Sequence, residues 1–86
     1  MPVVSRFFGI SIKIHFDEHA PPHFHAEYGG ENVAIAIREL QVLKGTPDAR
    51  VLGLVLKWAA LHQDELLVDW ERATSGQTPL PIDPLR

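Results

Sequence analysis

Residues 8–17 read Phe8-Gly9-Ile10-Ser11-Ile12-Lys13-Ile14-His15-Phe16-Asp17, and apolar and polar side chains alternate along them. Successive side chains of a β-strand point to opposite faces of the sheet, so this pattern predicts a strand with one buried face. Phe8, Phe16 and the isoleucines between them are expected to face the core. Lys13, His15 and Asp17 are expected on the opposite face. This stretch therefore predicts which face of the sheet is buried against the rest of the protein.

Two further strands are predicted downstream, at about residues 23–28 and 32–38. Gly29-Gly30 between them is a hairpin signal, since glycine readily adopts the positive φ angles of a two-residue turn. Residues 39–44 could add a brief fourth strand. The core positions of these strands are expected to be Phe24, Ala26, Tyr28, Val33, Ile35 and Ile37.

Helical periodicity extends from about residue 46 to about residue 73. Thr46 is expected as the capping residue, with Pro47 at the first helical position and Asp48 in the first turn. Ser75-Gly76 is expected to end the helix, with a break near His62 as an alternative to one continuous helix. The predicted fold class is α+β: a small antiparallel sheet of three or four strands with one long C-terminal helix on one face. Residues 1–76 form the domain, and residues 77–86 form a proline-rich extended tail.

The composition sets broad limits on function. The chain has 86 residues, a net charge of −3 and no cysteine, which predicts one domain without disulfides or thiolate metal sites. An acidic balance does not indicate a bulk electrostatic attraction to nucleic acid. No apolar run approaches the roughly 20 residues needed to span a bilayer. The N-terminus does not read as a secretory signal, so a cytoplasmic location without membrane association is expected.

Four of the five histidines lie within residues 15–25. If the first two strands pair as a hairpin, His15, His23 and His25 share the face that the helix leaves open. Three imidazoles could hold a divalent transition metal such as zinc. Alternatively, His23 and His25 could act as general acid and base, assisted by Asp17. Whether the chain is an enzyme, and whether it has a cofactor, stays open.

Neighbouring residues suggest what such a site could accept. Lys13 and Arg38 fall on the same face and would suit a phosphate or a developing negative charge. Two simpler alternatives stay open: a solvated surface pair of histidines, or an interface at which the histidines hydrogen-bond to a partner. Between the first two strands, one of the peptide bonds before Pro21 and Pro22 could be cis, although base rates favour trans, so the isomers stay open.

Several motifs together resemble a known family. They are Met1-Pro2-Val3-Val4-Ser5-Arg6-Phe7-Phe8-Gly9-Ile10, the stretch His19-Ala20-Pro21-Pro22-His23-Phe24-His25-Ala26-Glu27-Tyr28-Gly29, the helical Trp58-Ala59-x-Leu61-His62, and Leu66-Leu67-x-x-Trp70. The chain resembles the bacterial domain of unknown function 4160 family, most specifically in its Pro-Pro-His-Phe-His element. Ala20 stands where family members usually have a polar residue.

The resemblance implies a cytoplasmic protein encoded beside a member of the domain of unknown function 2442 family, as one half of a type II toxin–antitoxin pair. It therefore implies a protein partner. We consider a small ribonuclease-like toxin acting on RNA first, and a non-catalytic protein-binding module or a metal-binding protein as alternatives. A homodimer formed through an exposed strand edge is a further expectation.

Overall fold

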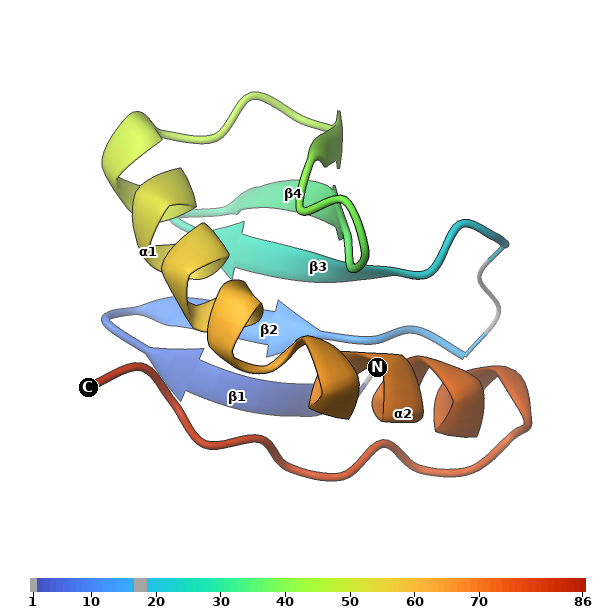
Figure 1. Ribbon diagram of the computed structural model, residues 1–86. Coiled ribbons are helices and arrows are strands. Elements are labelled where there is room, and N and C mark those ends of the chain that lie inside the picture. Colours follow the sequence, from blue (N-terminus) through green and yellow to red (C-terminus); the bar gives the residue numbers. More distant parts are fainter. Residues whose placement is uncertain (1, 17–18) are drawn as a thin grey trace.

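A five-stranded antiparallel sheet carries two helices on one of its faces (Figure 1). The computed structural model describes residues 2–16 and 19–86. The strands are paired in chain order and are β1 (Val3–Phe7), β2 (Ile10–Lys13), β3 (His23–Tyr28), β4 (Glu31–Ala36) and β5 (Val42–Lys44). The helices are α1 (Ala49–Leu61) and α2 (Gln63–Thr74). The α+β class and the antiparallel sheet are confirmed. The sheet has five strands instead of the three or four expected, and the helical segment is broken near His62, the alternative to one continuous helix that the sequence allowed.

Strand β1 is the element that the sequence pattern missed. Phe8 and Gly9 have φ angles of 51° and 79°, so they form a two-residue turn of the kind that joins antiparallel strands. The predicted strand over residues 8–17 therefore begins only at Ile10, and residues 3–7 pair with it as β1. Phe8 is at the tip of this turn with 58% of its surface exposed. Its prediction as a core residue is wrong.

The isoleucine face of β2 forms the centre of the core. Ile10, Ile12 and Ile14 are each at most 1% exposed, as the alternation predicted. The pairing of β2 with β3 ends at Lys13, opposite His25. Residues 14–16 are not paired with β3, so strand pairing does not determine which way the side chain of Phe16 points. Phe16 is 40% exposed instead of facing the core.

Strands β3 and β4 form the predicted glycine hairpin. Gly29 and Gly30 have φ angles of 58° and 82°, and the register places Tyr28 opposite Glu31. Strand β5 lies within the residues expected for a brief fourth strand. The peptide bond between Ala20 and Pro21 is cis, an isomer that the sequence left open.

The helical segment is divided at His62, whose φ and ψ of −129° and 25° are not helical. Asp48 caps α1, because its carboxylate accepts hydrogen bonds from the backbone N–H groups of Arg50 at 2.8 Å and Val51 at 3.2 Å. This corrects the expectation that Thr46 is the cap. As expected, α2 ends at Ser75-Gly76: Gly76 has a φ of 80° and its N–H donates to the carbonyl of Ala73. That pattern is the common glycine termination of a helix.

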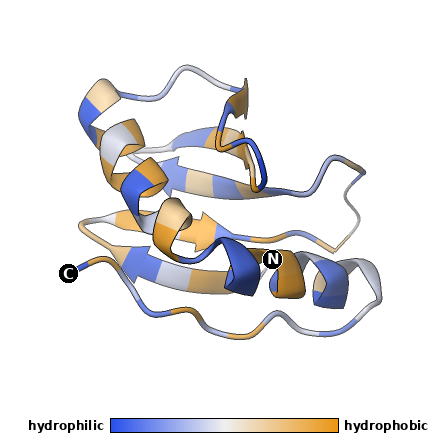
Figure 2. Ribbon diagram, in the orientation of Figure 1, coloured by the Kyte–Doolittle hydropathy of each residue, from blue (hydrophilic) through white to orange (hydrophobic). Residues whose placement is uncertain are grey.

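The core lies between the sheet and the helices, and hydrophobic positions alternate with hydrophilic ones along both layers (Figure 2). Trp58 of α1 is fully buried there. Its indole N–H donates to the carbonyl of Asp83 at 2.7 Å, and the N–H of Ile82 donates to the carbonyl of Val4 at 2.8 Å. Residues 77–86 have no regular secondary structure, yet they run beside β1 and are held against the domain (Figure 1).

Candidate functional site

The structure brings the three predicted histidines together. The ring centroids of His15 and His25 are 4.1 Å apart, and those of His23 and His25 are 5.2 Å apart. The pairing of Lys13 with His25 causes this arrangement, since it carries His15 past the end of β2 toward the start of β3. We call these three residues the histidine cluster.

The cluster is not entirely on an open surface. His23 is only 9% exposed, and its ring centroid lies 5.0 Å from that of Trp70 in α2. The expectation that all three rings lie on a face left bare by the helices is therefore wrong for His23. His15 and His25 are half-buried. One end of the cluster rests on a buried indole, and the other end is accessible.

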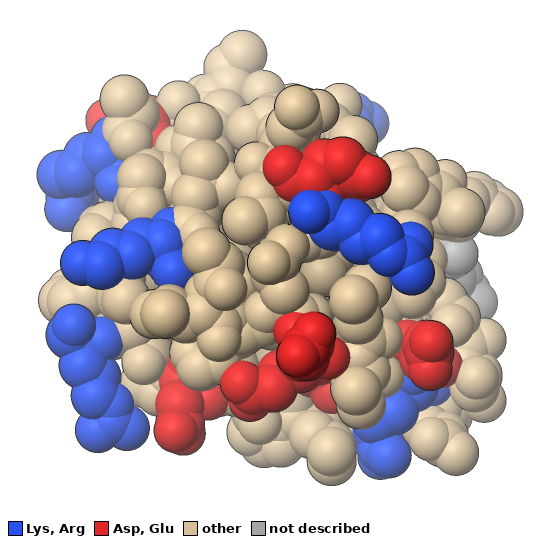
Figure 3. Space-filling model, in the orientation of Figure 1, with Lys and Arg blue, Asp and Glu red and all other residues tan. Residues whose placement is uncertain are grey.

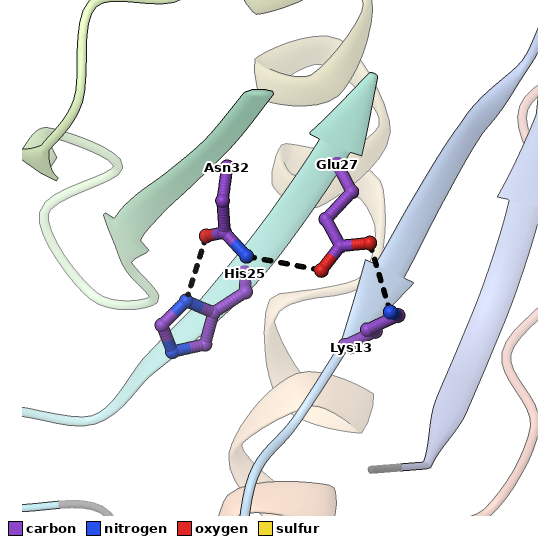
Figure 4. A network of polar contacts seen from close by, with 4 residues as sticks. All are labelled: Lys13, His25, Glu27 and Asn32. Carbon is purple, nitrogen blue, oxygen red and sulfur yellow. Dashed lines mark hydrogen bonds and ion pairs between the residues drawn. The ribbon is translucent and has the colours of Figure 1, made fainter. Parts of the chain in front are cut away.

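Four residues on the same face form a connected set of polar contacts (Figure 4). Lys13 Nζ donates to Glu27 Oε1 at 2.8 Å, and Asn32 Nδ2 donates to Glu27 Oε2 at 3.1 Å. The Oδ1 atom of Asn32 is 3.1 Å from His25 Nδ1. We call Lys13, His25, Glu27 and Asn32 the polar network.

The polar network determines which nitrogen of His25 carries the proton. A carboxylate can only accept hydrogen bonds, so Asn32 must direct its NH₂ group to Glu27 and its oxygen to His25. Nδ1 of His25 then donates, and in the neutral ring the lone pair is on Nε2. His23 has the same tautomer, because its Nδ1 lies 2.8 Å from the carbonyl oxygen of Pro21, which can only accept. Neutral imidazoles with this tautomer present Nε2 as a base or a ligand.

Next to the histidine cluster, the positive charge of Lys13 is balanced by the negative charge of Glu27. The hydrogen bond from Lys13 holds the pKa of Glu27 below its ordinary value, and the charge of Lys13 and the hydrogen bond from Asn32 act in the same direction. Glu27 is therefore ionised at neutral pH and is paired with Lys13. A phosphate that approached Lys13 would compete with this carboxylate.

The other predicted substrate-binding residue, Arg38, lies in the turn after β4 and is exposed. Its backbone carbonyl accepts a hydrogen bond from Gln63 Nε2 at 3.2 Å, which fixes the turn against the start of α2. The structure gives no contact between its guanidinium and the histidine cluster. Asp17, the predicted acidic assistant, lies outside the described residues.

The described residues do not contain a metal site. Within residues 2–16 and 19–86, no group of three or more histidine, aspartate and glutamate side chains is placed to hold a metal ion. The rings of His15 and His25 meet edge to face, at 89°. The prediction that His15, His23 and His25 together bind zinc is not supported by this geometry.

Three residues of the site were not predicted. Glu27 has the same strand parity as His25, and Asn32 is placed opposite Glu27 by the two-residue glycine turn. Both could have been found by extending the predicted hairpin residue by residue. Trp70 could not, because its contact with His23 depends on where α2 crosses the sheet.

The sequence profile of the domain of unknown function 4160 family (DUF4160) matches residues 9–71. This match covers more than half of the chain. The chain belongs to the DUF4160 family. Its matched segment contains the histidine cluster, the polar network and Trp70, and it excludes β1 and the tail.

No curated protein and no solved structure is similar enough to this DUF4160 chain to count as a match. None of its described helices is both long enough and apolar enough to cross a bilayer. Because the family description carries no activity, the function has to be argued from the site itself.

Proposed function

We propose that this DUF4160 protein is a toxin–antitoxin component that acts in the cytoplasm as a small ribonuclease-like toxin, with His23 and His25 as its acid and base. The observation that carries the proposal is the convergence of three imidazoles, two of which have their tautomer set by oxygen acceptors on Nδ1. An enzyme that cleaves RNA without a metal needs two proton-transferring groups on one phosphate, and histidine suits both roles near neutral pH.

The chemistry requires a base and an acid in the same site. One neutral imidazole removes the proton of a ribose 2′-hydroxyl while the 2′-oxygen attacks phosphorus. A protonated imidazole gives its proton to the departing 5′-oxygen. The products are a 2′,3′-cyclic phosphate and a 5′-hydroxyl, and the two rings exchange protonation states.

The phosphate charge would be countered by Arg38 and Lys13. Because Lys13 is paired with Glu27, we expect Arg38 to contribute more to RNA binding than Lys13 does. Arg38→Ala should then weaken RNA binding more than Lys13→Ala, and the Arg38 effect should shrink as the salt concentration rises. Equal losses, or a larger loss for Lys13→Ala, would remove this assignment.

The decisive experiment is inducible expression in a bacterial host, followed by growth and by analysis of total RNA. Wild-type protein is expected to arrest growth, and His25→Ala and His23→Ala are expected to abolish the arrest. His62→Ala is the matched control, because His62 pairs with Glu65 at the α1–α2 junction and takes no part in the histidine cluster. Circular dichroism of each purified variant shows whether the fold is kept. Folded variants of His23 and His25 that still arrest growth would contradict the proposal.

A second function, a non-catalytic protein-binding module, is favoured by the charge of the site. Lys13 is neutralised by Glu27 and the chain carries a net charge of −3, which is a poor setting for a polyanion. The partner would be the domain of unknown function 2442 type of protein encoded nearby, hydrogen-bonded to the histidines. Stable co-purification of the pair without any RNA cleavage would favour this function over the toxin.

The open sheet edge offers a route to a homodimer in either case. Val42 and Leu43 of β5 are 36% and 48% exposed, and an edge strand can pair with another chain. Light scattering after size exclusion should then give twice the monomer mass. A Leu43→Lys variant should return the protein to the monomer, and a wild-type mass of one chain at all concentrations would exclude the dimer.

A further inference from the structure

A cavity lies between α2 and the C-terminal tail, away from the histidine cluster. Its volume is about 250 Å³, below the roughly 300–1,000 Å³ usual for small-molecule sites. Helix α2 contributes Asp64, Glu65 and Asp69 to its lining, and the tail contributes Leu80 and Pro81. We call it the tail cavity. Its size suits a single side chain better than a cofactor.

Asp69 is the unusual group in the tail cavity. Its side chain is 1% exposed, and its Oδ1 accepts a hydrogen bond from the backbone N–H of Leu80 at 2.8 Å. Its Oδ2 is buried and has no hydrogen-bond partner among the described residues. Nearly all buried polar atoms in proteins have a partner, so an unpaired carboxylate oxygen needs an explanation.

The charged groups near Asp69 do not supply that partner. The nearest cationic influence is Arg72, whose Nε donates instead to the carbonyl of Thr78 at 2.9 Å. Glu65 adds a like charge and is itself paired with His62 at 2.6 Å. Burial raises the pKa of Asp69, while the hydrogen bond from Leu80 and the charge of Arg72 oppose this. A cation in the cavity would relieve the remaining imbalance.

The walls of the tail cavity are apolar where they open to solvent. Val68 and Leu80 line it and are 51% and 50% exposed. Acidic side chains gather on the surface over the start of α2 and the adjoining tail (Figure 3). A ligand that matches this arrangement has a cationic end for the carboxylates and an aliphatic stem for the walls, as lysine and arginine side chains do.

We propose that the tail cavity binds the lysine or arginine side chain of a partner polypeptide, with the Asp69 carboxylate as the counter-charge for its cationic end. The aliphatic part of that side chain contacts Val68 and Leu80, and Asp64 and Glu65 attract the charge at the rim. The site is separate from the histidine cluster and does not depend on the function proposed for it.

The test is an NMR titration of the ¹⁵N-labelled full chain with N-acetyl-lysine methylamide. N-acetyl-norleucine methylamide is the comparison, because it keeps the stem and lacks the charge. The backbone amide of Leu80 should shift saturably with the lysine probe and not with the norleucine probe. Equal responses to both probes, or no saturable shift, would overturn the proposal.

Two variants locate the contact. Asp69→Asn keeps Oδ1 for the Leu80 N–H and should weaken binding of the lysine probe at least about tenfold. Asp64→Asn, on the exposed rim, should weaken it less than about threefold. Equal effects of the two variants would overturn the role of Asp69. If Asp69→Asn does not fold, the wild-type protein provides the test. The pH titration of the Asp69 carboxyl carbon, followed by NMR, should move to lower pH when the lysine probe is added. A titration that does not move would refute the site.

Discussion

The histidine cluster and the tail cavity contact helix α2 at two neighbouring residues, Trp70 and Asp69. The two regions differ in whether their polar groups are satisfied by hydrogen bonds within the protein. Trp70 contacts His23, beside a polar network that joins four side chains by hydrogen bonds within the protein. Asp69 is buried with one carboxylate oxygen unpaired among the described residues. The first region holds its geometry without a ligand, whereas the second is stabilised when a cation is supplied. The difference separates a preorganised site from one that couples binding to stability.

Truncation of Trp70, the indole that contacts His23, should give the largest effect. Trp70→Ala removes a 9%-exposed indole and should lower the free energy of unfolding by about 3–5 kcal/mol. Val68→Ala on the same helix, at a residue 51% exposed, should change it by less than about 0.5 kcal/mol. Urea denaturation followed by circular dichroism measures both. A loss below about 1 kcal/mol for Trp70→Ala would mean that the indole does not support His23.

Neutralising Asp69 should raise stability. At pH 7, Asp69→Asn removes a buried unpaired charge and should increase the free energy of unfolding by about 1 kcal/mol. Because burial raises the folded pKa of Asp69, the wild-type carboxyl is destabilising above that pKa. The advantage of the variant should therefore shrink as the pH falls through the folded pKa toward the ordinary value for aspartate. An advantage that is independent of pH would contradict this explanation.

Breaking the polar network should have a smaller cost. Asn32→Ala removes its hydrogen bonds to His25 and Glu27 and should lower the free energy of unfolding by about 0.5–1 kcal/mol, since the side chain is exposed. Glu31→Ala, the preceding exposed residue of β4, is the control and should have no measurable effect. Equal effects of the two substitutions would show that the network contributes nothing to stability.

The smallest effect is expected for the ion pair between Lys13 and Glu27. The folded-state pKa of Glu27 is lowered, so ionised Glu27 stabilises the fold above the ordinary pKa of glutamate. This contribution is lost as the pH falls through the lowered value. Stability curves of wild type and Glu27→Gln should differ at pH 7 and converge in acid. Added salt should reduce the difference, because the pair is partly accessible to solvent. Curves that stay parallel down to pH 2 would refute the pairing.

The parts of the fold set by local alternation could be predicted from sequence. Most inward positions of β2, β3 and β4 are buried as the period of two predicts, and the Gly29-Gly30 turn fixes the register of β3 and β4. The prediction of Tyr28 as a core residue is wrong, since it is 38% exposed, and Ala34 and Ala36 are buried although they have the opposite parity. Phe8 could not be assigned, because its apolar side chain continued the alternation while its backbone turned. Asp48, and not Thr46, caps α1, because the Asp48 carboxylate accepts hydrogen bonds from two backbone N–H groups.

The candidate site was predictable only within the hairpin. The convergence of His15, His23 and His25 follows from strand pairing, which sequence patterns reveal. The contact of His23 with Trp70 and the burial of Asp69 under Leu80 depend on how α2 and the tail cross the sheet. These contacts are long-range, and no local periodicity encodes them.

The most direct test of the histidine cluster is long-range ¹H–¹⁵N NMR of its imidazole rings in the wild-type protein at neutral pH. We predict that the neutral rings of His23 and His25 carry their proton on Nδ1, and that nuclear Overhauser effects connect the ring protons of His15 and His25. Protons on Nε2 of both rings, or no contact between His15 and His25, would contradict the arrangement on which the proposed chemistry rests.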